Sequence, residues 1–402
     1  MSAARIGGGI AAAVLAALLI WFAAATTGPA PVVMPKVAIN ASGEGQAGKG
    51  NTPWTDRSKL MGDRQDPGTI AGVNVPTAAE TDKTVTKQER VSNPKQLIES
   101  WRLTNEMRGI LNDPAMHVGV TSVPYGNLNV LEQPQGRDWR RSRNETMMHT
   151  GGWLILGISL ALALFLFARG RIHIAEGESS ETVPRFGPLE RANHWMTASA
   201  FVILALTGLL ILYGKPLIEP WLGHDTFGNV ALVSVWLHMA AAVPLTIGII
   251  VMVALWLREN IPSRLDWEWL KRGGGFVSDS PDKPLARKFN AGQKAVFWGV
   301  VIGGLLALIS GLMLMFPFFW LGYTGMQWAQ LSHAAIGLLL IALIIGHIYI
   351  GTVGMQGAID AMWSGRVDRN WAKEHHKLWY DDLVKQPGAV RRDPGHPAQA
   401  AE

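Results

Sequence analysis

Long apolar stretches of the sequence contain four histidines: His194, His238, His333 and His347. Ionisable side chains at membrane depth are rare, and they usually face the interior of a helix bundle or a functional group. A single histidine in such a place is more often a hydrogen-bonding residue between helices than a metal ligand. These stretches hold four histidines and neither Asp nor Glu, and this set of residues predicts metal ligation.

The spacing of two of these histidines points to two separate centres. His333 and His347 are fourteen residues apart in one apolar stretch. In a helix this separation is about 3.9 turns, so both side chains project from nearly the same face, about 21 Å apart along the axis. Two metal centres at different membrane depths need this arrangement.

The types of residue present narrow the choice of metal centre. Cysteine is absent from the 402 residues, which excludes disulfides, thiolate-bound zinc, iron–sulfur clusters in this chain and c-type haem attachment. A zinc site needs three or four ligands at one depth, and a proton relay commonly includes Asp or Glu. Haem iron takes one axial ligand on each side. Two pairs of imidazoles therefore predict two b-type haems, each with two histidine ligands.

A glycine on one of the predicted helices is a further candidate for haem contact. Gly208 follows His194 by fourteen residues, which places it on the same helix face at the level of the second haem. A glycine there lets the backbone approach a macrocycle closely. Ordinary packing of small residues between membrane helices explains the glycine equally well.

The elements that position these residues are membrane helices. Five segments have close to the 20 or so apolar residues that a bilayer core requires: roughly 150–168, 192–213, 230–257, 295–316 and 329–352. Lys and Arg gather after the first, third and fifth segments, whereas the loops 214–229 and 317–328 hold only Lys215. Because basic loops stay in the cytoplasm, the topology pairs His194 with His347 at the inner side. It pairs His238 with His333 at the outer side.

The composition agrees with a membrane protein. Charged residues make up 17% of the chain and hydrophobic residues 48%, against about a quarter charged in globular domains. Many of the 17 tryptophans stand at the ends of apolar runs, as in an interfacial aromatic belt. The net charge of +5 is not gathered in a dense basic stripe, which argues against a nucleic-acid binder.

The sequence predicts an all-α integral membrane protein. It consists of a four-helix di-haem cytochrome b bundle, one extra transmembrane helix and an N-terminal, largely extended outer-face segment. Residues 1–25 are either a signal peptide, which we favour, or an uncleaved membrane helix. A short amphipathic helix is expected over residues 96–112. The predicted divisions are residues 1–25, the periplasmic segment 26–148, the extra helix 149–169, the haem domain 185–355 and a cytoplasmic tail 356–402. Within that tail, we expect His375 and His376 to be solvated.

Four separated motifs occur in order and together resemble the gamma subunit of membrane-bound formate dehydrogenase, a di-haem cytochrome b. They are RANHW (191–195), KFNAGQKAVFW (288–298), the pair His333 and His347, and NWAKEHHKLWYDD (370–382). The resemblance covers residues 185–383, and the chain departs from that family by its added residues 1–184.

The resemblance implies a set of partners and a direction of electron flow. Formate would be oxidised at molybdenum or tungsten in a catalytic alpha subunit. An iron–sulfur beta subunit would pass electrons to this chain, in the bacterial inner membrane. The same four histidines would hold the haems, and quinone would be reduced in this chain beside the inner haem. The quinone site of the family carries over to Asn290, Gly292 and Gln293, with His347 adjacent.

The residues themselves support a quinone site more weakly. Residues 283–294 join a basic loop to the fourth membrane segment, where a quinone head and cytoplasmic protons can meet. Asn and Gln amides donate to a quinone carbonyl, but a polar helix cap is an alternative reading of the same turn. Other functions also remain open: the cytochrome b subunit of another dehydrogenase such as a nickel–iron hydrogenase, a haem-free membrane anchor, or a transporter.

Overall fold

The computed structural model describes residues 2–27, 69–70, 73–74, 139–276 and 283–392. The chain divides into two units, residues 1–28 with 134–402, and residues 29–133. Within the second unit the structure describes one antiparallel pair of strands, β1 (Thr69–Ile70) and β2 (Val73–Asn74). The helix expected over residues 96–112 lies outside the described residues.

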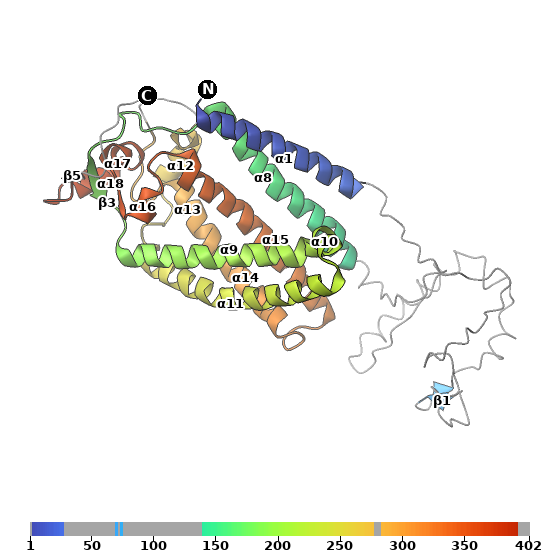
Figure 1. The fold of residues 1–402 in the computed structure, drawn as a ribbon. Helices are drawn as coiled ribbons and strands as arrows, with labels where there is room; N and C mark the ends of the chain where they lie inside the picture. The colour runs from blue at the N-terminus through green and yellow to red at the C-terminus, as the bar shows by residue number, and fades with distance from the viewer. Residues whose placement is uncertain (1, 28–68, 71–72, 75–138, 277–282, 393–402) are drawn as a thin grey trace. The chain divides into compact units, whose positions relative to one another are not determined.

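Among its described residues, the first unit has six helices that are long and apolar enough to cross a membrane. This confirms the all-α, multi-pass membrane fold (Figure 1). The helices are α1 (Ala3–Thr27), α8 (Met148–Arg169), α9 (Pro188–Leu217), α11 (His224–Trp256), α13 with α14 (Ala291–Trp298 and Gly304–Met315) and α15 (Tyr323–Tyr349).

Short stretches of π-helix extend or join three of these helices. The segment Ser142–Met147 precedes α8, Gly299–Gly303 connects α13 to α14, and Ile350–Gly354 continues α15. The short helix α10 (Glu219–Leu222) connects α9 to α11. It ends at Gly223, whose φ of 77° favours glycine. These connections make α9 with α11, and α14 with α15, two helix hairpins that pack together.

The helix α1 packs along α8 (Figure 1). A Cβ on Gly8 would lie 2.7 Å from the backbone nitrogen of Phe167, and one on Gly152 would clash with Cζ of Phe22. Arg5 Nη2 donates to the carbonyl of Arg169 over 3.3 Å, at the last residue of α8. Close approach through glycine is typical of helix pairs in membranes, so α1 has the packing of a membrane helix.

Residues 170–187 and 355–392 fold together into a small cap at the ends of the helices. In its sheet, β3 (Glu181–Pro184) lies between β4 (Arg366–Asp368) and β5 (Arg391–Arg392), with both pairs antiparallel. Its helices are α16 (Asp360–Trp363), α17 (Arg369–His375) and α18 (Lys377–Leu383). Val183 and Val367, paired across the sheet, are fully buried. The expected tail is therefore a folded element as far as Arg392.

The expectation that His375 and His376 are solvated was wrong, because the cap buries both. They are 8% and 1% exposed. His376 Nδ1 donates to the carbonyl of Arg287 over 2.7 Å, and its Nε2 accepts from Arg185 Nη2 over 3.0 Å. The Arg185 guanidinium lies 5.0 to 5.3 Å from the ring centres of three aromatic residues, Phe186, Trp371 and Trp379. Cation–π contacts thus hold a buried charge between the two chain segments of the cap.

We predict that the cap loses stability as the pH falls below about 6.5, the pKa of an unperturbed histidine. Burial lowers the pKa of His375 to about 3 and that of His376 well below its usual value. The unfolded cap then binds protons that the folded cap does not, so stability is complete above pH ~6.5. It falls by about 1.4 kcal/mol per pH unit for each histidine as the pH drops toward the folded pKa values. The measurement is proteolytic cleavage within residues 377–392 as a function of pH.

A variant that lacks the two buried histidines tests whether their protonation causes the loss of stability. In the unaltered chain, protonation of the two histidines should lower the free energy of unfolding of the cap by about 4 kcal/mol at pH ~5. His375→Gln with His376→Gln should abolish this loss. His224→Gln, at an exposed histidine on α11 outside the cap, serves as the control and should change nothing. If the double variant and the unaltered chain open over the same pH range, the buried histidines do not set this stability.

Candidate haem sites

Two pairs of histidine rings face each other inside the bundle. His194 on α9 and His347 on α15 have ring centres 6.2 Å apart, with planes inclined by 61°. His238 on α11 and His333 on α15 have ring centres 6.0 Å apart, inclined by 69°. The structure thus brings together the residues that the predicted topology paired, at two levels of the same helix α15.

The ring separation in both pairs fits one metal ion between two imidazoles. Metal–nitrogen bonds of about 2.0 Å place the two ligating nitrogens about 4 Å apart, which brings the ring centres to about 6 Å. Within the part of the chain that the structure describes, no group of three or more His, Cys, Asp or Glu side chains is arranged to hold a metal. Two imidazoles on opposite sides of one ion are the axial ligand set of a b-type haem.

Hydrogen bonds fix both rings of the outer pair through Nδ1. His238 Nδ1 lies 2.9 Å from Thr207 Oγ1. His333 Nδ1 lies 3.0 Å from the carbonyl of Ala307 and 3.1 Å from Ser310 Oγ. A carbonyl oxygen only accepts, so His333 Nδ1 carries the proton. Its Nε2 lone pair is then available to a metal, which is the usual tautomer of a ligating histidine.

The inner pair has different surroundings. His194 Nδ1 is buried and no described residue is its hydrogen-bond partner. Beside it, Arg191 donates to the carbonyls of Met362 and Trp363, and thereby ties α9 to the cap. Asn193 Nδ2 donates to the Gly248 carbonyl on α11 over 3.1 Å. The polar groups next to His194 therefore hold helices together and leave its ring without a fixed partner.

The predicted site glycine Gly208 lies against a histidine of the outer pair. A Cβ on Gly208 would stand 3.3 Å from Cε1 of His238, and one on Gly311 would stand 3.1 Å from Cε1 of His333. Both contacts are tighter than ordinary van der Waals packing. Gly311 was missed from the sequence, although its signal is the Ser310–Gly311 dipeptide, which parallels Thr207–Gly208 on the other hairpin.

The turn expected to bind quinone forms a helix cap in the structure. Asn290 Oδ1 accepts from the backbone nitrogen of Gln293 over 3.0 Å, and Gln293 Oε1 accepts from that of Asn290 over 3.1 Å. This is a reciprocal capping box at the start of α13. Both oxygens are therefore used, and the side-chain amino groups remain as donors. A Cβ on Gly292 would lie 3.1 Å from Cη2 of Trp269, so an indole already covers this glycine.

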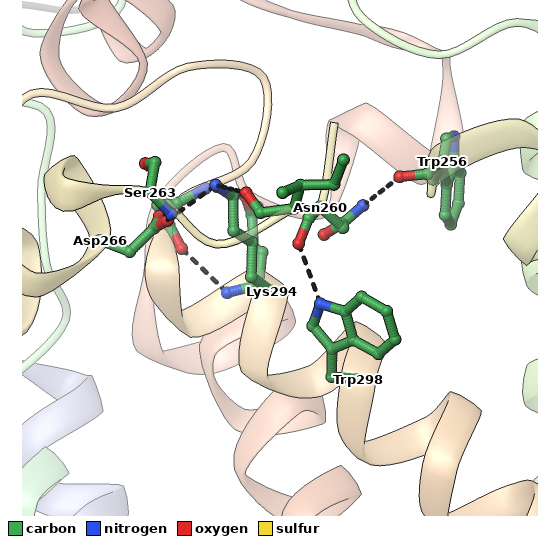
Figure 2. Close-up of polar contacts among 9 residues, drawn as sticks. Trp256, Asn260, Ser263, Asp266, Lys294 and Trp298 are labelled. Carbon is green, nitrogen blue, oxygen red and sulfur yellow. Dashed lines mark hydrogen bonds and ion pairs between the residues drawn. The ribbon is translucent and has the colours of Figure 1, made fainter. Parts of the chain in front are cut away.

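An ion pair supports the same turn from α12 (Arg264–Lys271), the short helix that follows α11 (Figure 2). Lys294 Nζ lies 2.9 Å from Asp266 Oδ2 and donates to the Ile261 carbonyl over 3.0 Å. Burial raises the pKa of Asp266, but hydrogen bonds from Lys294 and Ser263 outweigh this, and the pKa lies below its usual value. The cavity that these residues share with Asn290 measures about 10 Å³, room for about one water molecule.

Comparisons with known proteins agree with this helical haem bundle. Residues 185–365 match the family model described as prokaryotic cytochrome b561. The nitrate-inducible formate dehydrogenase cytochrome b556 subunit of Escherichia coli K12 is 30% identical over 220 residues, which cover 54% of this chain and 98% of that subunit. A second formate dehydrogenase cytochrome b556 subunit of the same strain is 32% identical over 207 residues, 51% of this chain and 95% of that subunit.

A more distant relative has the same description. The formate dehydrogenase cytochrome b556 subunit of Haemophilus influenzae is 27% identical over 198 residues, which cover 48% of this chain and 80% of that subunit. The family model begins at residue 185, three residues before α9, so its match leaves out α1 and α8. On these grounds the chain belongs to the family of formate dehydrogenase cytochrome b556 subunits.

Proposed function

We propose that this chain is the membrane electron-transfer subunit of a formate dehydrogenase and holds two b-type haems. His194 and His347 would ligate the inner haem, and His238 and His333 the outer one. The observation that carries this proposal is the pair of facing imidazole sets, with ring centres 6.2 and 6.0 Å apart. When bound, haem supplies one-electron transfer, and two centres about 21 Å apart along α15 would span much of the bilayer.

The orientation in the membrane follows from the basic loops. Arg169 ends α8 and Arg171 follows it, and Arg258, Arg264, Lys271 and Arg272 follow α11. These are the ends at which the cap lies, so the cap would face the cytoplasm and residues 26–148 the periplasm of the inner membrane. The haem domain would be residues 185–355, with 149–169 as the extra helix. Electrons would enter at the outer pair and leave at the inner one.

Quinone reduction is proposed at the cytoplasmic end of α13. The Asn290 and Gln293 amino groups can donate to a quinone carbonyl, since the capping box uses only the two oxygens. The cavity beside the turn is too small for a quinone ring. The ring would therefore approach from the lipid side of the turn or require movement of Trp269, which packs on Gly292.

The catalytic chemistry on formate would belong to partner subunits. This chain has no cysteine and therefore no thiolate ligands for iron–sulfur clusters. An iron–sulfur beta subunit and a molybdenum or tungsten alpha subunit would supply electrons from the periplasmic side. Residues 26–148 would lie on that same side, within reach of those subunits. The relatives are named as formate dehydrogenase subunits, which favours formate over hydrogen as the electron source.

The purified chain tests the proposal through its absorption spectrum. We expect a reduced-minus-oxidised difference spectrum of b-type haem and a haem content of two per chain, because two complete axial ligand sets are present. A chain without haem would indicate a membrane anchor or transporter. One haem per chain would contradict the assignment of one of the two pairs. Co-purification with hydrogenase subunits would replace formate by another electron donor.

A further inference from the structure

In both helix hairpins, a hydroxyl residue followed by a glycine faces a histidine of the outer pair. On α9, Thr207 and Gly208 face His238 of α11, and on α14, Ser310 and Gly311 face His333 of α15. In each hairpin a hydroxyl contacts the histidine Nδ1 and the next residue is a glycine beside the ring. The repetition in the two hairpins indicates a shared requirement of the two rings.

In the first hairpin, the hydroxyl proton is already engaged within the helix. Thr207 Oγ1 donates to the carbonyl of Ile203 over 2.6 Å and lies 3.2 Å from that of Leu204. A hydroxyl has one proton and two lone pairs. Toward His238, 2.9 Å away, Thr207 therefore acts as an acceptor.

The second hairpin repeats this arrangement. Ser310 Oγ lies 2.8 Å from the carbonyl of Leu306 and 3.1 Å from that of Ala307. His333 Nδ1 approaches both Ser310 Oγ and the Ala307 carbonyl. In both hairpins, then, a ring contacts a hydroxyl that donates within its own helix, and His333 also contacts the Ala307 carbonyl. Both contacts require a proton on Nδ1 and leave Nε2 as the metal-binding atom.

The glycines allow the rings to reach these acceptors. A Cβ on Gly208 or Gly311 would come within 3.3 and 3.1 Å of Cε1 of the facing histidine, so a larger residue would displace the ring. The inner pair differs, because His194 Nδ1 has no partner among the described residues. Among the described residues, hydroxyls contact both rings of the outer pair and neither ring of the inner pair.

We propose that Thr207 and Ser310 are positioning residues that lower the midpoint potential of the outer haem relative to the inner one. A hydrogen bond from Nδ1 raises the basicity of a ligating histidine. A more basic ligand stabilises ferric iron more than ferrous iron. Because the outer pair donates two such bonds and His194 none, electrons would run from the lower to the higher potential in the direction of the quinone turn. This inference rests on the proposed function.

The test is a redox titration of the purified chain, followed through haem absorption. Thr207→Val with Ser310→Ala removes both hydroxyls and should raise the potential of one haem while the other keeps its value. Affinity for that haem should fall by about 10- to 100-fold. The conservative variant Thr207→Ser with Ser310→Thr keeps both hydroxyls and should restore the potential.

Thr246→Val with Ser159→Ala provides a matched control. These hydroxyls make the same bond to a carbonyl four residues before them, without a histidine contact in the described structure, and both haem potentials should remain unchanged. A double variant with two haems at unaltered potentials would overturn the inference and leave the proposed function intact. An unaltered chain without haem would overturn the proposed function itself, and the inference with it.

Discussion

Replacing His333 by Ala should remove the outer haem and reduce the haem content from two to one per chain. The change leaves His238 as the only axial imidazole of that pair, among apolar helices. Loss of a hydrogen bond to a ligating histidine costs about 10- to 100-fold in metal affinity, and loss of the ligand itself should cost more. The measurement is haem content per purified chain with the absorption of the remaining haem.

The two pairings give this prediction its controls. His238→Ala should remove the same haem as His333→Ala, whereas His194→Ala and His347→Ala should both remove the other. His224→Ala changes an exposed histidine that contacts Glu219 outside the pairs, and should leave two haems. If His333→Ala and His347→Ala removed the same haem, the two-level arrangement along α15 would be wrong.

Hydropathy and helix period were sufficient to predict the membrane fold and the candidate ligands. A helix that crosses the bilayer needs a continuous stretch of apolar residues, so each span can be recognised from its own part of the sequence. The fourteen-residue spacing of His333 and His347 fixes a common helix face in the same local way. The basic loops then determine which helix ends meet, and this is why the topology could pair His194 with His347 before any contact was seen.

Contacts between distant segments could not be predicted in this way. The cap joins β3 to β4 across the whole haem domain, and no local pattern in residues 356–392 indicates that partner. His375 and His376 were therefore expected in solvent. Similarly, a single Thr207 or Ser310 in an apolar stretch predicts only a hydroxyl that is hydrogen-bonded to a carbonyl of its own helix. The contact with a histidine could not be predicted, because that histidine lies 31 residues after Thr207 and 23 residues after Ser310.

Turnover of the complete complex in sealed proteoliposomes should generate a membrane potential, negative inside, when formate is oxidised outside. Electrons that enter at the outer pair and leave near Asn290 carry negative charge inward, and the protons for quinol would be taken up inside. Each charge then works against the potential at a cost of about 2.3 kcal/mol per 100 mV. The apolar segments 192–213, 230–257, 295–316 and 329–352 hold no Asp or Glu, so no dedicated proton channel is expected. An uncoupler should therefore accelerate quinone reduction.

A variant of the turn at Asn290 and Gln293 separates its role as a helix cap from its proposed role as a quinone site. Asn290→Asp with Gln293→Glu keeps both capping oxygens, and negative charge is favourable at a helix N-terminus, but it removes both amino donors. Formate should still reduce the haems in this complex, whereas quinone reduction and the potential should be lost. Unchanged activity would show that these amides do not bind quinone. An electroneutral reaction in the unaltered complex, indifferent to the uncoupler, would instead place quinone reduction on the outer face, because only there would electron and proton stay on one side of the membrane.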